Sequence, residues 1–169
     1  MKLHSTLIIL LFIFVFSCKS KTAFDYSQQI VKMETDLAAG ISMADEKVSR
    51  FLEAEQNDSA IIITRQMEKL ADEKLKQVES LAAPNVKEGD NFKKEAIRYF
   101  SYLKSIYTSF HKFTAANTDE EKEAERQKLA RIVDDKEEAT KALQVAQQKF
   151  AAANNFRIEK VDKKEAKNE

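Results

Sequence analysis

The chain has 169 residues with 28 basic and 28 acidic side chains, which gives a formal net charge of zero at neutral pH. Because charges of both signs alternate along every segment, the sequence lacks the basic stripe that nucleic-acid binding requires, and this class is excluded. With two glycines, one proline and abundant alanine, leucine, lysine, glutamate and glutamine, the composition predicts an all-α protein. Its single cysteine excludes an intramolecular disulfide.

The first 18 residues have the pattern of an export signal. Lys2 precedes an apolar run at residues 7–16, which ends at Ser17 and Cys18. A helix needs roughly 20 apolar residues to cross the hydrocarbon of a bilayer, so this run is too short for a permanent membrane span. Phe16 also departs from the small-residue pattern of an ordinary signal-peptidase site.

The segment Val15-Phe16-Ser17-Cys18 resembles the lipobox of bacterial lipoproteins, in which a small residue precedes the lipidated cysteine. This resemblance covers residues 1–18, and Phe16 is bulkier than the usual occupant. It implies that residues 1–17 are removed as a signal peptide, that Cys18 receives a diacylglycerol, and that its new amine is acylated. Two or three acyl chains anchor a protein firmly, since each buried methylene contributes about 0.8 kcal/mol. The alternative is that Cys18 merely ends a signal.

Residues 18–23 are predicted to form the lipidated cysteine and a short polar tether. By resemblance to the sorting rules of Gram-negative lipoproteins, the lack of an aspartate directly after Cys18 implies the outer membrane. We expect the periplasmic face, because the tether lacks the acidic cluster by which some lineages signal surface display. The cell surface stays open as an alternative.

Residues 24–56 carry apolar side chains at three- and four-residue steps, which predicts the first long helix. Gly40 lies inside this helix and predicts a bend or a close helix contact. Cap residues at 57–59 begin a second amphipathic helix, which ends before Pro84. The stretch 84–91, with the only proline, is the clearest loop and a candidate partner-facing feature.

Residues 91–116 predict a third helix with a broad apolar face, and therefore the most buried helix. Thr118 and Glu121 have the spacing of a capping box that starts a fourth helix. Four long amphipathic helices joined by short loops predict an antiparallel up-down-up-down four-helix bundle after the N-terminal signal segment. A longer two-helix coiled coil that dimerises is the alternative.

The predicted organisation has four parts. The domain boundaries are 1–17 for the signal peptide, 18–23 for the lipidated cysteine and tether, 24–156 for the helical bundle and 157–169 for a charged flexible tail.

The sequence contains no constellation of residues that indicates catalysis, and we expect no enzyme activity and no cofactor. His111 is the only histidine after the signal segment. A metal site built from two Glu-x-x-His pairs needs two histidines and is therefore excluded. Neither a serine-nucleophile elbow nor a glycine-rich phosphate loop is present. The carboxylate runs are typical of solvated helix faces.

The aromatic face of the third helix is the candidate ligand or partner face. Its members are Tyr99, Tyr102, Tyr107 and Phe110. Such a stripe most often forms core, but tyrosine can also present a hydroxyl at the rim of a groove. Tyr102 lies toward the flank of the stripe, so it is the best candidate for a role outside the core.

Two functional hypotheses follow. The leading one is a non-enzymatic envelope lipoprotein, tethered to the membrane through its lipid, whose helices bind an unidentified envelope protein or act as a spacer. The alternative is a carrier or sensor that binds a small apolar ligand between its helices, in a cavity of about 300 Å³ or more beside the aromatic face.

Overall fold

The computed structural model describes the backbone of residues 3–158 and the side chains of residues 20–158. This part of the chain contains helices and no strand, so the predicted all-α class is confirmed. The helices are α1 (Leu3–Glu53), α2 (Asn57–Ser80), α3 (Gly89–Ala115), α4 (Asp119–Asp134) and α5 (Lys136–Ala153).

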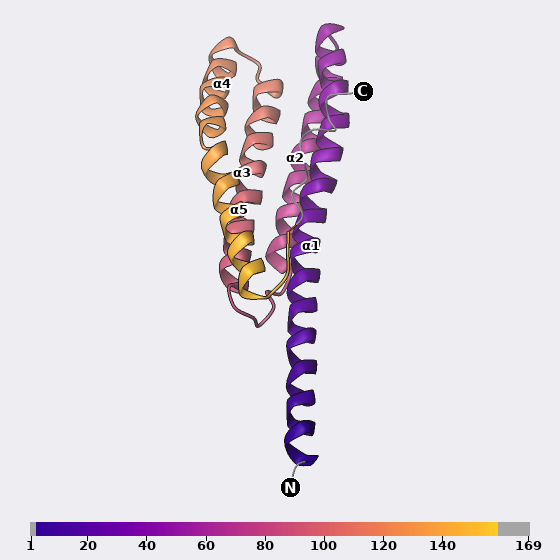
Figure 1. The fold of residues 1–169 in the computed structure, drawn as a ribbon. Coiled ribbons are helices and arrows are strands. Elements are labelled where there is room, and N and C mark those ends of the chain that lie inside the picture. The colour runs from indigo at the N-terminus through magenta and orange to yellow at the C-terminus, as the bar shows by residue number, and fades with distance from the viewer. Residues whose placement is uncertain (1–2, 159–169) are drawn as a thin grey trace, which may run out of the picture.

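The helices form an up-down-up-down bundle within one chain (Figure 1). Helix α2 packs against α1 and α3, and α3 packs against both α4 and α5, which follow one another as the fourth member. Helix α1 contacts α5, whereas α4 packs mainly against α3. The predicted four-helix arrangement is therefore confirmed, and its fourth member contacts α1 through α5.

Helix α1 begins at Leu3, earlier than the predicted start at residue 24, and the first buried side chain from residue 20 onward is Ala23. The side chains of residues 1–17 and of Cys18 lie outside the described residues, as do residues 159–169 of the predicted tail. The tether at 18–23 stays a prediction. Within the described part of the chain, no helix combines the length and apolarity needed to span a membrane.

The fourth helix is divided at Asp135, which the sequence analysis did not predict. Asp135 has φ −77° and ψ −3°, and its amide donates to the Ile132 carbonyl at 3.2 Å, as at the end of a helix. An acidic residue is unfavourable at a helix C-terminus and favourable at an N-terminus because of the helix dipole. Asp135 lies at the N-terminus of α5, where its charge is favourable, but it also follows the C-terminus of α4, where its charge is unfavourable, and its side chain makes no capping hydrogen bond.

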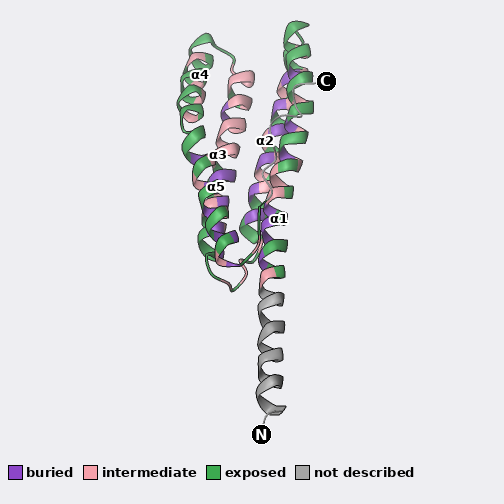
Figure 2. Cartoon of the chain, viewed as in Figure 1, coloured by how far each residue is buried: buried purple, intermediate pink, exposed green. Residues whose placement is uncertain are grey.

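Aromatic side chains form the core at the end of the bundle where α3 begins and α5 ends. Phe92 and Phe150 stack with ring centroids 5.1 Å apart, and Tyr26 meets them edge-on at 5.9 and 6.0 Å. Both phenylalanines are fully buried. Helix α4, in contrast, buries none of its side chains (Figure 2). The packing is therefore tight at one end of the bundle and looser at the other.

Two local predictions are confirmed. A Cβ atom at Gly40 would lie 2.5 Å from Leu70 Cδ2, so this glycine permits the close approach of α1 to α2. At the start of α4, the Glu121 amide donates to Thr118 Oγ1 at 3.2 Å, and the Thr118 amide donates to Glu121 Oε2 at 3.2 Å. This reciprocal pair is the expected capping box.

Candidate functional site

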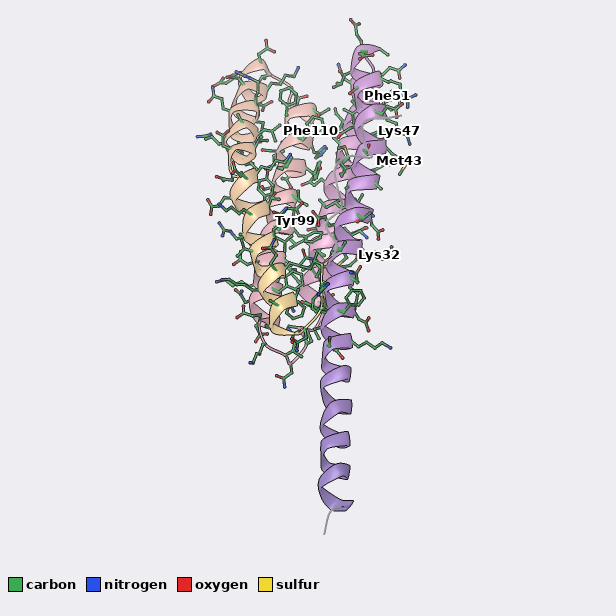
Figure 3. All side chains as sticks on the ribbon, in the orientation of Figure 1. Lys32, Met43, Lys47, Phe51, Tyr99 and Phe110 are labelled. Atoms are coloured by element: carbon green, nitrogen blue, oxygen red, sulfur yellow. The ribbon has the colours of Figure 1, made fainter. Side chains whose placement is uncertain are left out.

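The four predicted site residues lie on α3 and differ in burial. Tyr99 is 9 % exposed, whereas Tyr102, Tyr107 and Phe110 are half-buried. Figure 3 shows Tyr99 near the middle of the bundle and Phe110 closer to the end where α3 leads to α4. The four residues therefore run along α3 from the core toward the looser end of the bundle.

Tyr99 links α3 to α1. Its hydroxyl donates to Glu34 Oε1 at 2.8 Å, and its ring meets Phe100 edge-on at 5.7 Å. Burial, followed by the Glu34 carboxylate, raises the pKa of Tyr99 above its ordinary value. Because its hydroxyl already has a partner inside the bundle, Tyr99 serves the packing of the helices.

Tyr102 and Tyr107 present hydroxyls to an acidic environment. The Tyr102 hydroxyl oxygen is buried and has no hydrogen-bond partner among the described residues. Burial, then the charge of Asp135, raises the pKa of Tyr102. Burial, then the charge of Asp45 on α1, raises the pKa of Tyr107 to about 12. Both phenols therefore stay neutral at physiological pH and can donate a hydrogen bond.

Asp45 is the residue that sequence reasoning missed. Burial raises the pKa of its carboxyl, although much of the side-chain surface reaches solvent, because neighbouring protein atoms displace part of its hydration. It makes no ion pair with any of the described residues. The available signal was its position between Ile41 and Val48, which places an acid on the apolar side of the first helix.

Polar contacts hold α3 to its neighbours around Phe110. Ser109 Oγ donates to Glu125 Oε2 on α4 at 2.7 Å, and Thr64 Oγ1 on α2 lies 3.2 Å from His111 Nδ1. Thr64 and Ser109 are fully buried. His111, the lone histidine of the bundle, thus makes an interhelical hydrogen bond. Phe110, between these two residues in the sequence, is half-buried.

The looser end of the bundle is acidic. We define the distal end as residues 45–68 and 107–135, where α1 passes to α2 and α3 passes to α4 (Figure 1). It carries 13 acidic and 8 basic residues, a net charge of −5 with His111 neutral. The remaining residues of 20–158 carry 11 acidic and 14 basic side chains, a net charge of +3. The distal end is therefore more acidic than the rest of residues 20–158.

Hollows on the surface of the described residues include four that differ in place and size. Their volumes are about 620 Å³ along α4 and α5 near Lys136, 360 Å³ near Lys104, 330 Å³ between α3 and α5 near Arg98, and 230 Å³ between α1 and α2 near Gly40. Tyr99, Tyr102, Tyr107 and Phe110 line none of these four. The ligand-carrier hypothesis stays a prediction.

Among the described residues, no group of three or more histidine, cysteine, aspartate and glutamate side chains is placed to hold a metal ion. No family model, curated protein or solved structure matches the chain.

Proposed function

We propose that this protein is a bacterial envelope lipoprotein, anchored through Cys18, whose helical bundle is a non-enzymatic module that binds another protein at a distance from the membrane. The observation that carries the anchor is the lipobox-like segment Val15-Phe16-Ser17-Cys18 after a short apolar run. We place the anchor in the outer membrane with the bundle in the periplasm, since no aspartate follows Cys18.

The course of α1 supports the role of a spacer. This helix is unbroken from residue 18 to Glu53, a length of about 54 Å at 1.5 Å per residue. Ala23, the first buried residue among the described side chains of this helix, comes five positions after Cys18. Lipid on Cys18 would therefore hold the end of the bundle where α3 begins and α5 ends close to the bilayer. The distal end would then point away from the membrane.

The charge distribution supports the same orientation. The leaflet surface of a bacterial membrane that contains anionic lipids repels negative charge and attracts positive charge. The net charge of −5 at the distal end and of +3 elsewhere favours a bundle with its distal end away from the membrane.

The experiment is fractionation of the full chain and its Cys18→Ala variant, with Ser20→Ala as the matched control. We expect the wild-type chain and the control to sediment with the outer membrane. The Cys18→Ala chain should appear in the soluble fraction or remain unprocessed in the inner membrane. Identical outer-membrane fractionation of all three chains would refute anchoring through Cys18.

A further inference from the structure

A groove lies along the line where α3 and α5 meet. Its volume is about 330 Å³, and its lining comes from both helices. Ala142 and Ala146 line it with short side chains, and Val145 between them is 41 % exposed. Gln147, two positions later and therefore on the opposite side of α5, donates to Ser27 Oγ of α1 at 3.2 Å. The Val145 side of α5 thus faces away from α1.

The charged side chains of the groove leave two lysines without an acidic partner. Arg98 Nη2 lies 2.5 Å from Glu138 Oε1 on α5, and Arg98 Nη1 lies 3.8 Å from Glu95 Oε2 on the same helix. Both carboxylates of the lining are therefore close to the one guanidinium. Lys141 and Lys149 are exposed and make no ion pair with any of the described residues. The charge that the groove offers to a partner is therefore positive.

The two lysines flank the exposed valine at helical spacing. Lys141, Val145 and Lys149 follow one another at steps of four residues, so they lie on one side of α5. The step of eight residues from the first lysine to the second corresponds to about 12 Å along the helix axis, at 1.5 Å per residue. This side of α5 therefore presents an apolar side chain with one cation a turn before it and another a turn after it.

We infer that the groove between α3 and α5 binds a helix of another protein, in which an apolar side chain has an acidic residue four positions before it and another four positions after it. This inference rests on the proposed function as a binding module and specifies the partner's chemistry. Charge complementarity carries the choice, because Lys141 and Lys149 line the groove without acidic partners among the described residues. The carboxylates of such a helix repeat the spacing of the lysines in either direction along α5.

The size of the groove suits the apolar side chain of such a helix. A cavity of about 150 Å³ holds a benzene ring, so the groove has room for a large apolar side chain beside Val145. The short side chains of Ala142 and Ala146 let the backbone of a second helix approach α5 closely.

The lysines also argue against a second copy of the chain in this groove. A twofold contact centred on Val145 would bring the lysines of one copy against the lysines of the other, whether the two α5 helices run parallel or antiparallel. Like charges across an interface suppress association. An acidic helix removes the repulsion that a second copy would create.

The test uses the full chain, purified from membranes in zwitterionic detergent, and three synthetic alanine-rich helices of about 20 residues. The matched peptide has a central photo-crosslinking leucine analogue, with glutamate four positions before it and four positions after it. In the shifted peptide the same glutamates stand two positions from the leucine analogue, which turns them to the other side of the helix. In the basic peptide lysine replaces each glutamate. Fluorescence anisotropy measures the affinities, and mass spectrometry locates the cross-links.

We expect the matched peptide to bind most tightly and to cross-link to residues that line the groove. The shifted peptide should bind at least about fivefold more weakly, because its carboxylates cannot reach both lysines. The basic peptide should bind at least about tenfold more weakly, because it brings like charges together.

Charge-swap variants separate this groove from basic residues elsewhere on the chain. The groove variant carries Lys141→Glu and Lys149→Glu, and the control carries Lys112→Glu and Lys122→Glu, which are exposed lysines outside the groove. We expect the groove variant to bind the matched peptide about tenfold more weakly and to bind the basic peptide instead, because the swap restores opposite charges. The control should change either affinity less than about twofold.

Several results would overturn the inference. They are no binding of the matched peptide, equal binding of the matched and shifted peptides, cross-links outside the groove, or equal losses in the two variants. A dimer that the matched peptide dissociates in sedimentation would assign the groove to a second copy. Full displacement of the matched peptide by phosphatidylglycerol would assign the lysines to anionic lipid.

The intact mass of the same preparation keeps the test of the groove apart from the test of the anchor. It reports whether Cys18 carries lipid, and the peptide measurements do not depend on that modification. A lipidated chain that binds none of the peptides would refute the groove and leave the anchor standing.

Discussion

The two ends of the bundle should differ in how strongly they resist truncation of a phenylalanine. Phe92 is fully buried, stacks on Phe150 at 5.1 Å and meets Tyr26 edge-on at 5.9 Å. Burial of roughly 200 Å² at about 25 cal/mol per Å² corresponds to about 5 kcal/mol. Phe92→Ala should therefore lower the free energy of unfolding by about 3–5 kcal/mol, which includes the cavity that remains.

Phe113→Ala is the matched change at the distal end, where the ring is half-buried. Because part of the ring stays in water and its looser surroundings leave a smaller cavity, the expected loss is about 2–3 kcal/mol, smaller than for Phe92→Ala. Urea unfolding of the full-length variants, followed by circular dichroism at 222 nm, measures both values. Equal losses for Phe92→Ala and Phe113→Ala would contradict the account of a tight core at one end and loose packing at the other.

Gly89→Ala should destabilise the chain by about 1–3 kcal/mol in the same urea assay, because a Cβ there would lie 2.5 Å from the Pro84 carbonyl oxygen. A loss below about 0.5 kcal/mol would show that this loop can shift. Thr118→Ala removes the capping box and should cost about 1 kcal/mol, with faster amide exchange confined to the first turn of α4; exchange that rises equally in α2 would refute this local role. For Tyr107, whose pKa rises from 10.0 to about 12 on folding, the folded state keeps a proton that the unfolded state loses. The free energy of unfolding should therefore fall between pH 10 and 12, and less steeply in Tyr107→Phe; identical slopes would refute it.

Helical periodicity predicts most of this fold, because nearly every long segment repeats its apolar residues on one face. The close contact at Gly40 and the capping box at Thr118 are also visible in the sequence, since each depends on residues within a few positions. The division at Asp135 falls in a run of five charged residues, 134–138, which interrupts the apolar spacing between Val133 and Ala139. Lysine and glutamate are good helix formers, so this run by itself does not predict whether one helix or two would form.

The aromatic face of α3 shows where sequence patterns stop being informative. Tyr99 and Phe110 belong to the same stripe, yet one contacts Glu34 in the core and the other is half-buried. The difference depends on which neighbouring helices cover each position of α3, which the spacing of residues within α3 does not report. Likewise, the hydrogen bond between Thr64 and His111 joins residues 47 positions apart, and no local pattern predicts it.

Lipid on Cys18 is proposed to anchor the bundle, and the intact mass of the chain purified from native membranes would report that lipid. We predict a mass that lacks residues 1–17 and includes a diacylglycerol and an acyl chain. A mass without acyl chains, or a chain cut at another position, would contradict the claim.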